Sequence, residues 1–356
     1  MISNDYYFLV YYSVLSLFLF ISLLAINFYA QDSSNKWGGG LAVIILYCLF
    51  FSFRTADVGS DAGNYILLID NPAGLSQDMS PMIKIIASVV GFLGGGETLF
   101  FLAISMLVCI TLLYAFYKFE RKDFLVVFAI FSVSFLFVNI NVNLFRQGIA
   151  IAFGTLALSY LIERCYIKYL LFVILATFTH SSAVILLLSF MLVFFIRSRC
   201  YILIYIVCCI AFYTFDLSLE QIVFHFKESH WSFARLYWYL TWNKSDLFTL
   251  KHIYYLYLFI IIIFLFVFER LNDKQVRLFL VFLTIPSIMT IFRVDDFLVD
   301  RFTFYFIPVS ALLTFQLFKI FNLRTNVYVQ ALFVISLCFW LGKSILQFNA
   351  WWVEKV

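Results

Sequence analysis

The chain has 356 residues, of which 64% are hydrophobic, 21% aromatic and only 12% charged, and its mean hydropathy is +1.00. A soluble protein carries about 25% charged residues, so this composition excludes a soluble enzyme, a disordered chain and a nucleic-acid-binding module. The net charge of +4 is too small to indicate a polyanionic partner. The composition predicts a polytopic membrane protein.

The apolar runs predict an all-α fold of about twelve transmembrane helices, because a helix needs about 20 residues to cross a hydrocarbon core of about 30 Å. A further short run, 80–93, begins with Ser80 and Pro81, which are typical of a helix N-terminus. We expect this run to be re-entrant or interfacial. The expected spans are 6–29, 38–53, 97–117, 124–140, 147–162, 168–179, 182–196, 200–215, 253–268, 277–292, 302–319 and 326–346.

Basic residues predict the orientation, because short cytoplasmic loops are rich in Lys and Arg. Six short connections hold roughly half of the 24 basic residues, and all six lie on one face if the 80–93 run does not cross. The opposite, outer face then receives the loops 54–80 and 216–252. No loop is large enough for a soluble domain, so residues 1–356 are expected to form a single integral-membrane domain.

Polar residues follow the second span on this outer face. Arg54 ends the span, and Asp61 and Tyr65 would share one face if the stretch between them is helical. The alternative is a solvated loop whose arginine reaches the lipid headgroups. Further along, Arg146 and Gln147 open a helix, which suits an anion such as a phosphate. Anchoring of the arginine to lipid phosphate is the alternative there.

The later outer turns also carry candidate residues. His180 lies between two apolar runs too short to reach the outer surface, so we expect a recessed histidine that is either functional or a hydrogen-bonded packing residue. Arg301 and Tyr305 are four residues apart and should face the same way on one helix. The adjacent acids Asp295 and Asp296 have no evident third ligand, so no metal site is expected.

The loop 216–252 is rich in aromatic residues and includes Arg235 and Tyr239. One interpretation is that its helices lie in the membrane interface, where Trp and Tyr collect. The other is that its rings form a wall against which sugars stack.

Four motifs occur in a fixed order along the chain. They are Arg-x4-Gly-x-Asp-x3-Tyr from Arg54, Arg-Gln at Arg146, His-Ser-Ser-Ala from His180, and Asp-Arg-x3-Tyr-Phe from Asp300. This order resembles the EpsG-like branch of the Wzy-type polysaccharide polymerases of bacterial inner membranes. The resemblance covers residues 54–306. Ser80-Pro81 departs from it, because an acid–proline pair is common there.

The resemblance implies a multi-span glycosyltransferase, similar to the GT-C-like lipid-linked class, with its active site facing the periplasm. Its substrates would be undecaprenyl-pyrophosphate-linked oligosaccharides, and its product an O-antigen, capsule or exopolysaccharide chain. No cofactor is expected. The expected partners are the lipid-linked oligosaccharide and the lipid bilayer. Whether a chain-length regulator protein also binds is left open by the sequence.

The chemistry of this transfer assigns roles to the candidates. A pyrophosphate leaving group needs fixed positive charge rather than an acid, and the attacking hydroxyl needs a base, His180 or Asp61, of which we favour His180. The rivals are a flippase of the same substrate, which would place polar groups near the midplane, and an O-antigen-ligase-type transferase. We expect pyrophosphate contacts from Arg54, Arg146, Gln147, Arg301 and Tyr305, and sugar contacts from Tyr65, Arg235 and Tyr239.

Overall fold

The computed structural model describes residues 4–30, 32–53, 62–70, 80–196, 199–214, 262, 265, 268–291 and 296–320. Every regular element in these ranges is a helix, which confirms the all-α prediction. The chain divides into two compact units, and each is described by itself. The first comprises Met1–Tyr160, Tyr166–Ala183 and Thr314–Val356, and the second Leu161–Cys165 and Val184–Leu313.

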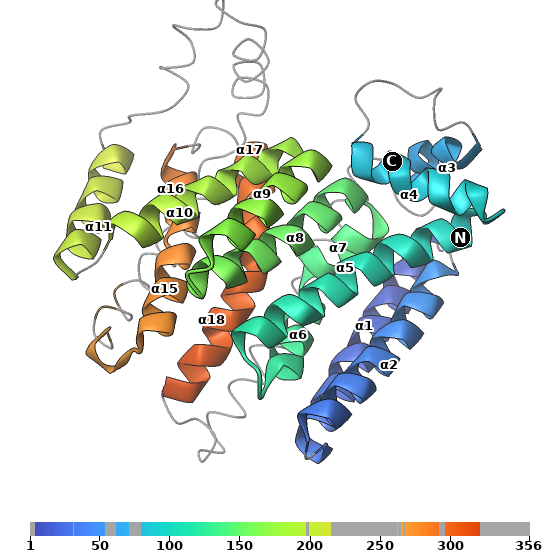
Figure 1. Ribbon diagram of the computed structural model, residues 1–356, viewed down its shortest axis with the longest axis horizontal. Helices are drawn as coiled ribbons and strands as arrows, with labels where there is room; N and C mark the ends of the chain where they lie inside the picture. Colours follow the sequence, from blue (N-terminus) through green and yellow to red (C-terminus); the bar gives the residue numbers. More distant parts are fainter. Residues whose placement is uncertain are drawn as a thin grey trace, which may run out of the picture. The chain divides into compact units, whose positions relative to one another are not determined.

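The first unit is built on two long neighbouring helices, α1 (Asn4–Tyr29) and α2 (Ser33–Ser52), which lie side by side (Figure 1). Helix α2 packs on α5 (Glu97–Phe119), and α1 packs on α6 (Phe124–Ser132). Helix α5 has an acid in its first turn and a lysine in its last, which suits the helix dipole. The unit also holds α3 (Ala62–Asp70), α4 (Pro81–Phe92), α7 (Phe135–Val142), most of α8 (Phe145–Ile162), α9 (Tyr166–Thr179) and the end of α18 (Ile307–Ile320).

Three helices in the described part of the chain are long and apolar enough to cross a membrane, namely α2, α5 and α8. Helices α6 and α7 add a fourth span if the bent pair is counted as one. Shorter apolar helices occupy several other predicted runs, so the expectation of about twelve crossings stays a prediction. The predicted span 326–346 and most of 253–268 lie outside the described residues.

The short run at 80–93 forms the helix α4, with Ser80 at the N-cap and Pro81 in the first turn. Its 12 residues are too few to cross a bilayer. The Ser80 hydroxyl is buried and makes no capping bond. The helix start is therefore favoured by Pro81, whose fixed φ suits the first helical turn. Helix α4 packs on α3, α5 and α9, and a Cβ added at Gly91 would lie 3.0 Å from the carbonyl oxygen of Ile69.

The apolar run at 124–140 does not form one continuous helix. It is divided into α6 and α7, which are bent by 75° at a short break. Ser132 turns its hydroxyl back to the carbonyl of Ala129 (2.8 Å), and Ser134 accepts the N–H of Phe137 as the N-cap of α7. Serine hydroxyls that bond the backbone compete with helix continuation, which explains the break.

A group of polar residues, the Asp123 cluster, joins several helix ends of the first unit. It consists of Asn27, Lys36, Glu120, Asp123, Gln316 and Lys319. Lys36 Nζ donates to the Lys122 carbonyl (3.0 Å) and to Asn27 Oδ1 (3.4 Å). Lys319 Nζ pairs with Glu120 (2.8 Å) and with Asp123 (3.4 Å). Asp123 is buried and Lys319 pairs with it from an exposed position, so the buried carboxylate has a charged partner.

The second unit packs α10 (Leu186–Phe195), which follows the 3-10 turn η1 (Ser181–Ile185), against α15 (Asp273–Phe282) and α16 (Thr284–Ile291). Helix α11 (Arg199–Thr214) also packs on α16. Tyr205 Oη donates to the carbonyl of Leu283 (2.7 Å), and Ser189 bonds Thr284 (2.9 Å). Such interhelical hydrogen bonds hold helices together where both faces are apolar. The unit also holds η2 (Phe268–Arg270), α17 (Asp296–Thr303) and η3 (Phe304–Phe306).

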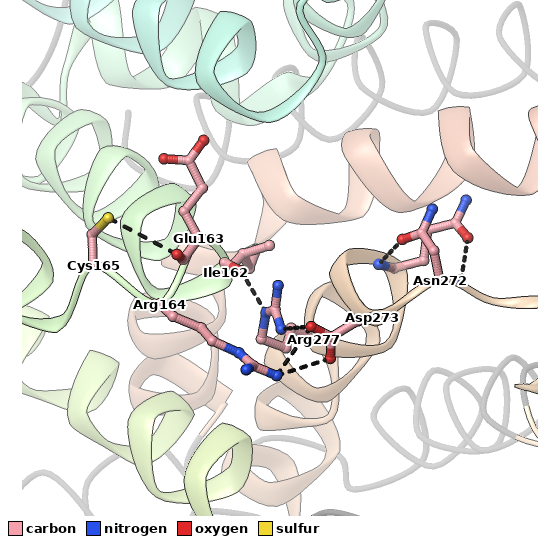
Figure 2. Close-up of polar contacts among 8 residues, drawn as sticks. Ile162, Glu163, Arg164, Cys165, Asn272, Asp273 and Arg277 are labelled. Atoms are coloured by element: carbon pink, nitrogen blue, oxygen red, sulfur yellow. Dashed lines mark hydrogen bonds and ion pairs between the residues drawn. The ribbon is translucent and has the colours of Figure 1, made fainter.

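A salt-bridged turn joins the end of α8 to the start of α15 within this unit (Figure 2). Arg164, whose φ is +63°, donates to both carboxylate oxygens of Asp273 at 3.1 and 3.0 Å. Arg277 bonds the same carboxylate and the carbonyl of Ile162. The hydrogen bond from Arg277 lowers the pKa of Asp273, and the positive charges of both arginines lower it further.

Candidate functional site

The start of α8 holds the most informative polar contact among the predicted site residues. Arg146 Nε donates to the hydroxyl of Tyr65 at 2.9 Å, and the guanidinium carbon lies 5.9 Å from the centre of the tyrosine ring. Tyr65 lies on α3, so residues 81 positions apart in the sequence are brought together. Gln147 is the next residue of the same helical turn and is buried.

Aromatic side chains fix this end of α8. Phe145 contacts Tyr65 edge-on, with ring centres 5.4 Å apart. It also contacts Phe101 (5.7 Å) and Phe100 (6.4 Å) in the first turn of α5. Edge-to-face aromatic pairs at these distances are favourable beyond the area they bury. The arginine therefore stands on a helix end that is held by α3 and α5.

The backbone at this helix start suits an anion. The first N–H groups of a helix have no acceptor within the helix, and the helix dipole adds partial positive charge there. The N–H of Gly148 makes the first helical bond, to the carbonyl of Leu144 at 2.6 Å. Arg146 and Gln147 lie in this same turn.

Three buried asparagines lie just before α8. Asn139 and Asn141 belong to α7 and Asn143 follows it, and all three are buried. Asn141 donates to the carbonyl of Phe137 (2.8 Å), while its Oδ1 is buried without a hydrogen-bond partner. The sequence shows these residues at every second position, a spacing that spreads them around a helix, so their common burial was not predicted. It follows from the packing of α7 on α5 and α6.

His180 lies at the end of α9, as the position of the turn predicts. Its N–H bonds the carbonyl of Ala176 (2.8 Å), and its carbonyl accepts the N–H of Ala183 (3.0 Å). The ring nitrogen Nδ1 lies 2.6 Å from the hydroxyl of Ser182. Ser182 had no assigned role in the sequence, although the His-Ser-Ser-Ala motif contains it. This contact fixes the orientation of the imidazole ring.

The remaining predicted residues divide into two groups. Two of them belong to the second unit, namely Arg301, which is half-buried on α17, and Tyr305, which is fully buried on η3. That they share a site with Arg146 stays a prediction. Arg54, Asp61, Arg235 and Tyr239 lie outside the described residues. Within the described ranges, no three His, Cys, Asp or Glu side chains gather as a metal site requires.

Comparison with known protein families shows which family this chain belongs to. The model of the EpsG family matches residues 40–354. The chain belongs to the EpsG family. The match includes every candidate residue from Arg54 to Tyr305, so the site lies within the part that makes this an EpsG-family chain.

Membership of the EpsG family, together with the apolar helices, makes this a membrane protein of polysaccharide biosynthesis and a glycosyltransferase-like polymerase. Neither a curated protein nor a solved structure matches the chain. The substrate and the roles of individual residues therefore depend on the geometry described above.

Proposed function

We propose that this protein is a polysaccharide polymerase of the bacterial inner membrane, with its active site facing the periplasm. It transfers a glycan chain from undecaprenyl pyrophosphate to the sugar end of another lipid-linked repeat unit. The observation that carries this proposal is the arginine at the start of α8, held by a tyrosine from α3, in a chain of the EpsG family. A fixed cation at a helix N-terminus suits a pyrophosphate.

The leaving group of this reaction needs charge stabilisation rather than an acid. A sugar hydroxyl of the acceptor attacks the anomeric carbon of the donor, and the bond from that carbon to the pyrophosphate oxygen breaks. Negative charge grows on the departing pyrophosphate, and preorganised donors stabilise it without reorganising. Arg146 and Gln147 fill this role in the first unit, and we propose Arg54, Arg301 and Tyr305 as further donors.

His180 is the proposed base for the attacking hydroxyl. A base must be the neutral imidazole, and in the tautomer whose Nδ1–H donates to the hydroxyl of Ser182 the proton acceptor is Nε2. We propose that this tautomer is the reactive one. With His180 as the base, Asp61 orients the sugar or an arginine. Asp61 is also the alternative base. If His180→Ala kept its turnover while Asp61→Asn lost it, the two assignments would be exchanged.

The direct test uses purified protein in detergent with a lipid-linked repeat unit, and the products are separated on a carbohydrate ladder gel. Arg146→Ala and His180→Ala are compared with Arg121→Ala, an exposed arginine in the turn before α6. The proposal expects a ladder from the unmodified protein and from Arg121→Ala, with and without a chelator, and no ladder from the two site variants.

Each other outcome contradicts the proposed function or the proposed metal independence. Unchanged substrate in every lane, when a known polymerase accepts that substrate, contradicts the proposal. Movement of intact substrate across a vesicle membrane would then identify a flippase. Transfer to a lipid A core acceptor alone would identify a ligase. A ladder abolished by the chelator would show that a metal ion takes part.

A further inference from the structure

We infer that Tyr65 is a positioning residue that holds Arg146 in the orientation needed to bind a pyrophosphate, and that it does not stack on a sugar. This inference rests on the proposed function for the identity of the anion. Tyr65 is only 3% exposed, and its ring meets Phe145 edge-on at 5.4 Å. A ring enclosed in this way presents no face on which a sugar could stack.

The bond between the two side chains selects one edge of the guanidinium. An arginine offers a carboxylate or phosphate either the edge that contains Nε or the end that contains its two terminal nitrogens. Tyr65 accepts the hydrogen bond of Nε at 2.9 Å. The Nε edge is therefore engaged by the tyrosine, and this hydrogen bond sets the direction of the guanidinium plane at the start of α8.

The tyrosine is itself held by a supported helix. Helix α3 packs closely on α4, where Gly91 lets the carbonyl of Ile69 approach to 3.0 Å of the position a Cβ would take. Helix α4 in turn packs on α5, whose Phe101 contacts Phe145. The hydroxyl of Tyr65 thus has a fixed place relative to the start of α8.

Without this contact, the arginine side chain would have other orientations. A long basic side chain near a membrane surface turns its charged end towards lipid headgroups. Reactions that depend on aimed donors lose rate when those donors must first be ordered. Loss of the tyrosine hydroxyl should therefore weaken pyrophosphate binding through Arg146 and through no other residue.

A double-mutant cycle tests this directly. Binding of farnesyl pyrophosphate to the purified protein is measured for the unmodified chain, Tyr65→Phe, Arg146→Gln and the double variant. Tyr47→Phe serves as the matched control, because it removes one hydroxyl from a ring that is similarly buried in the same unit. Polymerisation of the lipid-linked repeat unit is measured beside it for each variant.

We expect Tyr65→Phe to weaken farnesyl pyrophosphate binding about tenfold, as for the loss of a hydrogen bond to a charged group. In the Arg146→Gln background the same change should have no further effect, and Tyr47→Phe should bind like the unmodified protein. If Tyr65 had only a packing role, Tyr65→Phe would lower the melting temperature and leave the affinity of the folded protein for farnesyl pyrophosphate unchanged.

Four outcomes separate the possibilities. Unchanged affinity in Tyr65→Phe, or effects of the two changes that simply multiply, overturns the role of Tyr65. No binding by the unmodified protein overturns it as well. The expected cycle without any polymer from the unmodified protein supports the role of Tyr65 and contradicts the proposed polymerase.

Discussion

Replacing Gly148 by alanine tests whether the close approach of Gly148 on α8 to Ile140 on α7 sets the geometry of the site. A Cβ at this position would lie 2.8 Å from the carbonyl oxygen of Ile140 and 2.9 Å from its Cβ. Carbon–oxygen contacts of this kind are free of steric repulsion from about 3.3 Å. The two helices must therefore separate by about 0.5 Å, because a backbone oxygen cannot rotate away.

This separation should affect both stability and catalysis. Overpacking of this kind costs about 1–3 kcal/mol of unfolding free energy. It also moves the first turn of α8, which carries Arg146 and Gln147. Since a misplacement of about 1 Å costs about 100-fold in rate, half that distance should cost about tenfold in kcat/KM.

The chain offers two matched controls on α2. A Cβ at Gly38 meets nothing within 4 Å, so Gly38→Ala should stabilise the helix by about 0.5–1 kcal/mol. A Cβ at Gly40 would lie 2.6 Å from Cδ2 of Leu125, a flexible side-chain end, so Gly40→Ala should fall between the other two. Thermal unfolding in detergent and polymerisation rates rank the three variants. A Gly148→Ala protein as stable and as active as Gly38→Ala would refute the reasoning.

Three further changes have defined outcomes. Asp123→Ala removes the buried carboxylate that accepts a hydrogen bond from Asn27 and pairs with Lys319, and should cost about 1–3 kcal/mol, seen as a lower melting temperature. Asp273 has a lowered pKa because Arg277 bonds it, so its stabilisation is present above the ordinary value of 3.8 and is lost as the pH falls below it. Acid unfolding of Asp273→Asn should lack this step, and the two proteins should have equal pH dependence between about pH 5 and 8. Tyr205→Phe removes a hydrogen bond to the carbonyl of Leu283 and should cost about 1 kcal/mol in a thermal melt, with kcat unchanged.

Local patterns predicted the helices well where one physical effect dominated. The apolar run at 80–93 forms a helix from Pro81, because a proline in the first turn and the apolar residues after it favour the same structure. The run at 124–140 was predicted as one span, because its hydropathy is continuous. The break there depends on the hydroxyls of Ser132 and Ser134, whose bonding to the backbone is not visible in hydropathy.

The site was predictable only in part for a similar reason. Arg146 and Gln147 at the start of a helix follow from the local sequence. The contact of Arg146 with Tyr65 joins residues 81 positions apart, and only the tertiary fold brings these two side chains together. The burial of Asn141 likewise depends on the neighbours of α7, which no window of sequence describes.

The buried asparagines also constrain how the chain enters the membrane. Helix α7 has 8 residues, two of them asparagines, and a third asparagine follows it. Such a segment cannot partition into lipid alone, because its amides and the backbone at its break would face hydrocarbon. We therefore expect membrane integration of α7 to depend on α5 and α6, the helices that it packs on.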